Sequence, residues 1–226
     1  MDSMYVILLG LPLFKGVSYN RISEIVGSTR FHFLKYGPNE RIVTAGDPCT
    51  HIKFIISGRV KMVITNSDGR FRIEQQLSAP EVLAPDFLFG RATSYPGDVT
   101  SIETTGILQI DKNDYVEILH TDRVFLFNFL NLLSRNAQKS IDGILAVTTG
   151  TLEQRIAFWI IATTQHNSTN IVLTCKHRDL YALFGVQRNV FMSTLESMKD
   201  RGILTFSNSN SIEILSRPAL NELLNL

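Results

Sequence analysis

Arg188 and Asn189 are neighbours at the start of a C-terminal segment with helical periodicity. A guanidinium can form two hydrogen bonds with the edge of guanine, and a carboxamide can do the same with adenine. These two side chains are therefore candidates for reading base pairs in DNA, with Ser193 in a supporting position. The alternative for Arg188 is a contact with a backbone phosphate, which would position the protein without reading sequence.

Lys176 and Arg178 form a second group of candidates just before this segment, with His177 between them. We expect the two cations to hold DNA phosphates. For His177 two roles stay open, a phosphate contact or no contact with DNA. The formal net charge of the chain is only +1, which is low for a nucleic-acid-binding protein. Specific binding would therefore have to rest on these few contacts.

The elements that must position these side chains are two short helices joined by a tight turn. An apolar-faced segment at 178–184 meets Gly185, and a second helical segment runs from about Gln187 to Arg201. An inward-facing stripe at helical spacing is formed by Phe191, Leu195 and Met198. This layout is that of a helix-turn-helix, whose second helix lies in the major groove of DNA.

A β-hairpin is predicted directly after the second helix. Gly202 ends that helix, and the apolar runs 203–206 and 212–215 pair naturally across a polar turn. A short strand at 171–173 precedes the two helices. The C-terminal part therefore reads as a winged helix-turn-helix.

Residues 31 to about 111 carry the pattern of a β domain, with short β-branched runs separated by Gly, Pro and Asp turns. The expected strands are 42–44, 52–56, 60–65, 70–77, 100–103 and 107–110. Asp68 and Gly69 are a strong hairpin signal between two of them. Many short strands at regular spacing predict a sandwich, jelly roll or barrel.

A single long helix is predicted from about Thr121 to Thr149, where neither proline nor a turn cluster occurs. Its apolar stripe steps by three and four residues and consists of Leu126, Leu130, Leu133, Ala137, Ile141, Ile144 and Thr148. Such a helix would be roughly 40 Å long, more than a small domain can cover. We therefore expect a second copy to cover the stripe. Gly150 then marks a hinge, and Thr151 with Gln154 forms a capping box that starts the next helix.

The order of these parts resembles the bacterial cyclic-AMP receptor / fumarate-nitrate regulator (Crp/Fnr) superfamily of transcription factors. The residues that carry the resemblance are Gly10–Phe14, Tyr36–Asp47, Phe54–Val60, Arg155–Ala157 and Gly185–Arg188. It implies an α+β chain with an N-terminal cyclic-nucleotide-binding-like β jelly roll, a long dimerisation helix and a C-terminal winged helix-turn-helix. The corresponding limits are 1–120 for the effector or sensor domain, 121–149 for the helix and 150–226 for the DNA-binding domain.

The resemblance further implies a homodimeric, cytoplasmic regulator without enzymatic activity. Its partners would be double-stranded DNA with an inverted-repeat operator and RNA polymerase. A small-molecule effector is possible, and an effector-independent protein whose barrel is only a scaffold is the alternative. A cupin-like enzyme fused to a winged helix would need a metal-ligand cluster, and His32 and His51 do not have the required spacing.

The chain departs from cyclic-AMP-binding relatives where those carry a Gly-Glu pair and an Arg-Ser pair for ribose and phosphate. Ala84-Pro85 and Tyr95-Pro96 stand at these places. The carboxylate and guanidinium are missing, and a proline has removed an amide donor. The expected effector pocket is mainly apolar and comprises Leu83, Ala84, Pro85, Asp86, Phe87 and Tyr95, with Ser140 and Ile141 from the long helix. Arg59, Arg72 or Arg91 could supply an anion contact, but nothing in the sequence places them there.

Several cofactor classes are excluded by composition. Cys49 and Cys175 are too few for an all-cysteine iron–sulfur cluster, and the five histidines show no pairing typical of haem ligation. Two distant cysteines fit a reducing cytoplasm. The apolar run at 4–14 is too short to span a bilayer and lacks the basic region of a signal peptide. We therefore expect no metal or cofactor and no membrane association.

Overall fold

The computed structural model describes residues 3–148, 150–207 and 210–224. These residues form two compact units, one made of residues 1–61 and 77–136 and the other of residues 62–76 and 137–226. The second unit thus takes up residues 62–76 from the middle of the predicted β domain, which the sequence did not indicate. The predicted domain limits stay a prediction.

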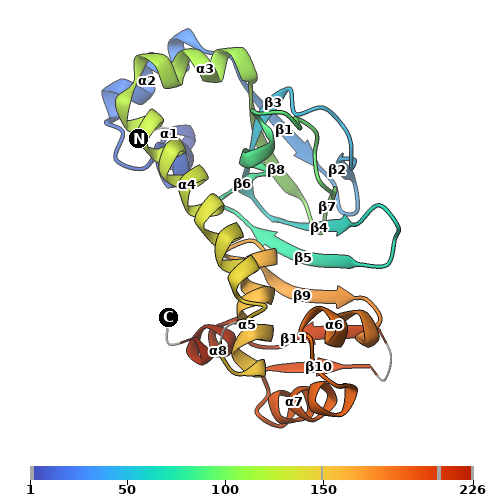
Figure 1. The fold of residues 1–226 in the computed structure, drawn as a ribbon. Helices are drawn as coiled ribbons and strands as arrows, with labels where there is room; N and C mark the ends of the chain where they lie inside the picture. Colours follow the sequence, from blue (N-terminus) through green and yellow to red (C-terminus); the bar gives the residue numbers. More distant parts are fainter. Residues whose placement is uncertain (1–2, 149, 208–209, 225–226) are drawn as a thin grey trace. The chain divides into compact units, whose positions relative to one another are not determined.

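The first unit is a β structure preceded and followed by helices (Figure 1). Its helices are α1 (Ser3–Gly10), η1 (Pro12–Phe14), α2 (Tyr19–Ser28), η2 (Pro85–Phe87) and α3 (Lys112–Thr121). Its strands are β1 (Phe31–Tyr36), β2 (Arg41–Val43), β3 (His51–Ser57), β6 (Glu81–Leu83), β7 (Asp98–Ser101) and β8 (Thr105–Asp111). Four of them form an antiparallel sheet in the order β1-β8-β3-β6, and β2 pairs with β7.

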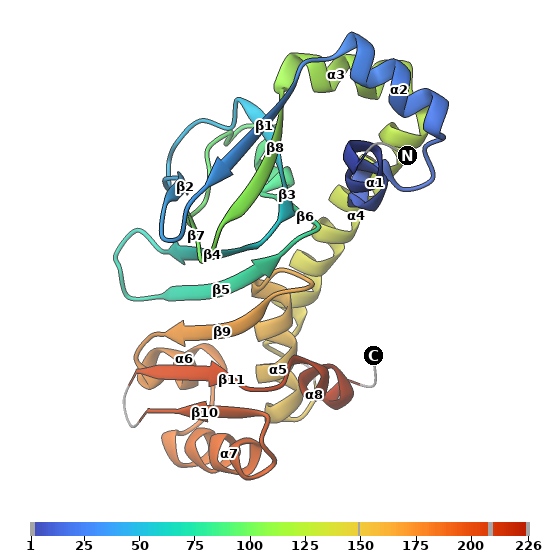
Figure 2. The same ribbon diagram turned by 180° about the vertical axis from the view of Figure 1, so that it is seen from behind.

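The second unit contains a sheet and four helices of its own. Two strands and one helix span the boundary and belong partly to each unit. The second unit's own elements are α5 (Leu152–Thr163), β9 (Thr169–Thr174), α6 (His177–Leu183), α7 (Arg188–Asp200), β10 (Leu204–Phe206), β11 (Ser211–Ile214) and α8 (Arg217–Leu223). The shared elements are β4 (Arg59–Thr65), β5 (Arg72–Ser78) and α4 (Arg123–Leu145). Figure 2 shows α8 beside α5 and α7 beside β10, and these pairs are in contact.

The six predicted strands are confirmed within one or two residues at each end. The Asp68–Gly69 hairpin is also confirmed, since Gly69 has a φ of 71° and its N–H donates to the carbonyl oxygen of Asn66 at 3.0 Å. The pairing of β5 was not expected: residues 72–76 lie antiparallel to β9, with Ile73 opposite Leu173. Pattern alone indicates that a segment is a strand, but not which distant strand is its partner.

The helix predicted from about Thr121 to Thr149 is confirmed within two residues at its start, but it was predicted to extend past Leu145, where α4 ends. Asp122 has an extended backbone and separates α3 from α4. Its carboxylate accepts hydrogen bonds from the N–H groups of Val124 and Phe125, at 2.9 and 3.1 Å, and so caps the new helix. α4 ends at Leu145, so that Thr148 lies outside it, while Thr149 lies outside the described residues. The capping box of Thr151 and Gln154 is confirmed, and Gly150 before it has a φ of 85°.

Aromatic contacts bring distant parts of the first unit together around Phe14. The ring of Phe14 meets those of Phe54 and Phe125 edge-on, with centroids 5.8 and 4.7 Å away, and all three side chains are fully buried. These contacts join η1, β3 and the start of α4. Buried aromatic residues each contribute several kcal/mol to folding, so this cluster fixes where α4 leaves the β structure.

A glycine in the turn between β3 and β4 is required by space as well as by backbone conformation. Gly58 has a φ of 80°, and a Cβ there would lie 2.7 Å from the carbonyl oxygen of Thr104. Gly46 in the same unit has a φ of 88°, but a Cβ there would meet nothing within 4 Å. A side chain introduced at either position would therefore strain the backbone, but only at Gly58 would it also overlap with neighbouring atoms.

We expect Gly46→Ala to lower the free energy of unfolding by about 1–2 kcal/mol, the strain of a positive φ with a side chain. Gly58→Ala should lower it by a further 1–3 kcal/mol or so, because Thr104 and its neighbour must also move. Urea denaturation of both variants measures the difference. Equal losses at the two positions would show that the close contact with Thr104 has no energetic weight.

Candidate nucleic-acid interface

The turn between α6 and α7 is held by backbone hydrogen bonds that require a left-handed residue. Gly185 has a φ of 63°, and its N–H donates to the carbonyl oxygen of Ala182 at 3.1 Å. The N–H of Val186 donates to the carbonyl oxygen of Tyr181 at 3.0 Å. This closes α6 as a glycine C-cap does and redirects the chain within a few residues. Gln187 then has an extended backbone and precedes the first residue of α7.

The inward stripe of α7 is confirmed, because Phe191, Leu195 and Met198 are fully buried. They pack into the core of the second unit with residues of α5, β9 and β11. The opposite face carries Asn189 and Ser193, which are exposed. The rotation of α7 about its own axis is therefore fixed by its apolar residues, and its polar face is open for a partner.

The polar side chains in the first turns of α7 differ in whether they are hydrogen-bonded within the helix. Arg188 and Asn189 are its first two residues, and both are exposed. The hydroxyl of Ser193 donates to the carbonyl oxygen of Val190 at 3.0 Å, so its hydrogen is turned back to its own helix. Ser193 therefore keeps its oxygen lone pairs as acceptors for a partner.

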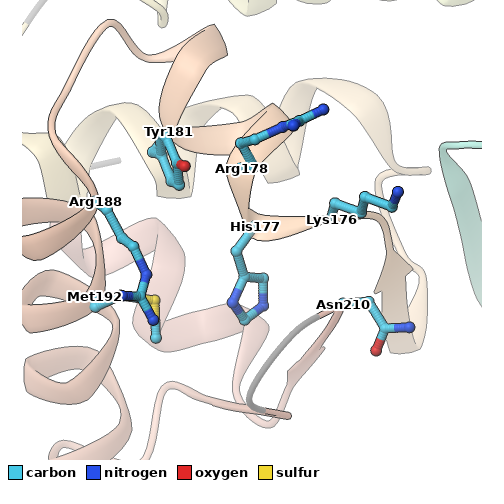
Figure 3. Close-up of a pocket in the computed structure, with 7 residues that line it drawn as sticks. All are labelled: Lys176, His177, Arg178, Tyr181, Arg188, Met192 and Asn210. Atoms are coloured by element: carbon cyan, nitrogen blue, oxygen red, sulfur yellow. The ribbon is translucent and has the colours of Figure 1, made fainter.

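A pocket of about 370 Å³ brings together the candidate phosphate contacts and the first residue of α7 (Figure 3). Its lining consists of Lys176, His177, Arg178, Tyr181, Arg188, Met192 and Asn210. Asn189 and Ser193 do not line it. Sequence reasoning missed Tyr181, Met192 and Asn210. The first could have been found, because it lies four residues after His177 on the same face of α6, whereas Asn210 comes from the chain between β10 and β11.

The cations of this pocket have few acidic neighbours. Lys176 and Arg188 are exposed and form no ion pair within the part of the chain that the structure describes. Arg178 is 3.7 Å from the carboxylate of Asp179, a loose contact between exposed groups. Exposed pairs of this kind contribute little, so the pocket presents a local excess of positive charge despite the near-neutral chain.

His177 forms the buried part of the pocket. Its side chain is 6% exposed, and its ring lies between those of Phe191 and Phe206, with centroids 6.2 and 5.9 Å away. Neither ring nitrogen has a hydrogen-bond partner among the described residues. Burial lowers the pKa of His177, and the backbone of Ser211 opposes this shift without reaching hydrogen-bond geometry. The net effect favours the neutral imidazole.

The expected effector pocket is only partly assembled within one unit. Residues 83–87 and Tyr95 belong to the first unit, whereas Ser140 and Ile141 belong to the second. Leu83, Ala84 and Pro85 are buried, and Ala84 has an unusual φ of 46° that starts η2. Phe87 is half-buried. This stretch offers mainly apolar surface.

Several polar groups that were considered for this site have partners. Asp86 is exposed, and both of its carboxylate oxygens accept from the side-chain nitrogen of Asn136 on α4, at 2.8 Å. Tyr95 is buried, which raises its pKa, and its hydroxyl donates to the carbonyl oxygen of His51 at 3.4 Å. Arg59 is paired with Glu103 and Arg72 with Glu74. Two of the three arginines that could have supplied an anion contact are thus engaged by carboxylates.

Cysteine and histidine chemistry is limited in the described residues. Both cysteines are free, buried thiols, and burial raises the pKa of Cys175 to about 11. The rings of His32 and His51 are 6.4 Å apart, a proximity the sequence did not indicate. No group of three or more His, Cys, Asp or Glu residues suited to a metal ion occurs in these ranges. Within them, no helix combines the length and apolar character needed to cross a lipid bilayer.

Comparison with known proteins finds a family match within residues 33–122. Residues 33–122 match the family described as the cyclic nucleotide-binding domain. The curated potassium channel GORK of Arabidopsis thaliana is 28% identical over 157 residues, which is 65% of this chain. The same match covers only 18% of the channel, so this chain spans less than a fifth of that relative's length.

Solved structures share the fold of nearly the whole chain. The catabolite activator protein of Thermus thermophilus is 19% identical, with a TM-score of 0.52 over 94% of this chain and 97% of its own. A Crp/Fnr-family transcriptional regulator from Eubacterium rectale is 18% identical, with a TM-score of 0.51 over 96% and 99%. These similarities show a shared fold over nearly the whole chain, and the family match concerns residues 33–122 alone.

We expect cyclic AMP not to bind tightly, because Pro85 lacks an amide hydrogen and Arg59 and Arg72 are already paired. Burying a phosphate there without charge-assisted partners would cost several kcal/mol. Isothermal titration calorimetry with cyclic AMP and cyclic GMP measures this. Sub-micromolar affinity for either nucleotide would contradict it.

Proposed function

We propose that this chain is a sequence-specific DNA-binding transcription regulator of the Crp/Fnr type that acts as a homodimer. The observation that carries the proposal is the start of α7, where exposed Arg188 and Asn189 adjoin a pocket of cations without strong acidic partners. A guanidinium and a carboxamide on an open helix face can address base edges, and the cations beside them can hold the backbone.

The proposed DNA-binding domain is a winged helix-turn-helix within residues 150–226. α6 and α7 are the two helices, and the wing is the antiparallel pair of β10 and β11, with Leu204 opposite Ile214. Gly185 supports this assignment, since it closes the turn between the helices. In this arrangement α7 enters the major groove, Arg188 and Asn189 read bases, and Lys176, Arg178 and Ser193 contact phosphates or support readout.

The proposed dimer forms along α4. Several apolar side chains of its predicted stripe are exposed in the single chain, among them Leu130 at 46%, Ile141 at 58% and Ile144 at 73%. A second copy of the same helix would bury these side chains in a seam with near-heptad spacing. Two recognition helices related by a twofold axis would then favour an inverted-repeat operator with half-sites about 10 bp apart.

The remaining parts of the proposal concern the barrel and the partners. Any effector would be more apolar than cyclic AMP and would bind near residues 82–91; the second candidate is a regulator that needs no effector. Asp86 favours that candidate, because its carboxylate is already bound by Asn136. We further propose that the protein is cytoplasmic and is not an enzyme. In this proposal it needs no metal or other cofactor, and RNA polymerase is a further partner.

The dimer is tested by placing charges in the stripe. Leu133→Asp combined with Ile141→Asp should give monomers with weak DNA binding, because unpaired carboxylates would be buried in the seam. Light scattering at micromolar concentration measures the mass. Asn131→Asp on exposed α4 surface off the stripe is the matched control and should remain dimeric. A monomeric wild-type protein would exclude the dimer.

The base-reading role is tested by selecting binding sites from random DNA. Arg188→Ala should lower affinity by about 1–3 kcal/mol and relax one base position, if the contact with guanine is bidentate. Lys176→Ala is the matched control. It should weaken binding to all DNA sequences equally and reduce the slope of log affinity against log salt concentration by about one. Retention of the full wild-type motif by Arg188→Ala, with a uniform loss of affinity, would make Arg188 a phosphate contact.

A further inference from the structure

His177 is an unusual group for the core of a small domain. A buried polar side chain normally finds a hydrogen-bond partner, and leaving one unsatisfied costs about 1–3 kcal/mol. Both ring nitrogens of His177 lack a partner in the described part of the chain, although the residue lines an open pocket. A phenylalanine would fill the same space between Phe191 and Phe206 without this penalty. The imidazole therefore points to a ligand that supplies the missing interaction.

The charges around His177 specify the sign of that ligand. Lys176 and Arg178 precede and follow it in the chain and line the same pocket, with side chains directed away from the ring, and Arg188 reaches the pocket from α7 (Figure 3). Lys199, near the end of α7, lies over the ring of Phe206 at 5.3 Å from its centroid.

The remaining neighbours offer little negative charge. Asp179 lies 3.7 Å from Arg178, and Glu196 is paired with Lys199 at 3.4 Å. The hairpin contributes the neutral groups of Asn210 and Ser211. Positive charge therefore dominates around the imidazole, and the ligand that fits is an anion.

We propose that this pocket seats one backbone phosphate of bound DNA and that His177 takes up a proton when the phosphate binds. The inference rests on the proposed function and adds to it a site and a linked proton. DNA is the expected source of the phosphate because Arg188 belongs both to the pocket and to the base-reading end of α7. A phosphate in the pocket would thus lie beside the base edges that Arg188 and Asn189 address.

The linkage follows from electrostatics. In the free protein, burial lowers the pKa of His177 and favours the neutral imidazole, while the backbone of Ser211 acts in the opposite direction. A phosphate offsets the cations of the pocket and accepts the N–H of the ring, so both effects favour the imidazolium. Phosphate binding then raises the pKa of His177, and by reciprocity protonation tightens phosphate binding. DNA affinity should increase as the pH falls through the window between the two pKa values, by at most about tenfold per pH unit for one proton.

The experiment measures the affinity of the full chain for a labelled duplex of mixed sequence by fluorescence anisotropy. The pH is varied from about 8 to 6 at constant salt, where histidine titrates. His177→Phe keeps the aromatic contacts and removes both nitrogens. His177→Gln keeps a polar side chain without titration and serves if the first variant does not fold. His166→Gln is the matched control, because His166 is exposed in the same unit.

Wild type and His166→Gln should bind more tightly as the pH falls, and both His177 variants should lose that additional increase. Wild-type binding with the same pH dependence as His177→Phe would overturn the inference and leave the proposed function intact. Absence of DNA binding at every pH would overturn both.

A second experiment distinguishes a DNA phosphate from a free phosphate ion as the ligand of this pocket. NMR titration of the histidine rings with inorganic phosphate, assigned with His177→Gln, should show only a weak effect on His177, whereas the duplex should raise its pKa clearly. A strong response to inorganic phosphate without a response to DNA would make the pocket a small-anion site and would overturn the assignment to the DNA backbone.

Discussion

The burial of one apolar stripe on α7 is the constraint on which the proposed interface depends. Phe191, Leu195 and Met198 are fully buried in the core of the second unit, so α7 cannot rotate about its axis without exposing them. Exposing three such side chains would cost several kcal/mol, which is comparable to the whole stability of a small domain. The outward direction of Arg188 and Asn189 is therefore a consequence of hydrophobic packing and needs no polar contact to maintain it.

The same packing accounts for the local electrostatics. The chain carries almost no net charge, yet the turn between β9 and α6 and the start of α7 bring three cations around one pocket. Elsewhere in the second unit some charges are paired, as Glu153 is with Arg201. At the pocket, Lys176 and Arg188 have no ion pair among the described residues. Net charge is a poor guide to binding here, because the field that a phosphate meets depends on nearby groups.

The sequence predicted those features that depend on local pattern. The limits of α7 were predicted within one residue at each end, because its buried residues recur at helical spacing. The start of α4 was predicted two residues too early, because the spacing of apolar residues does not show that the carboxylate of Asp122 caps this helix. The pairing of β5 with β9 and the presence of Asn210 in the pocket were also missed. Both join segments far apart in sequence, and periodicity holds no information about which of them meet.

Residues 33–122 are similar to a cyclic nucleotide-binding domain, in which Ala84-Pro85 and Tyr95-Pro96 are the proposed departures from a nucleotide site. In any ligand-gated protein, the effector must bind one arrangement of the domain better than another. Here the segment that would bear the effector is already connected to α4, because Asp86 in η2 accepts two hydrogen bonds from Asn136. A contact made by the chain itself can hold η2 against the proposed dimer helix in the absence of a ligand. We expected the side chains that a nucleotide needs to be missing at the same place. That expectation and the internal contact favour the same candidate, a regulator whose barrel acts as a scaffold.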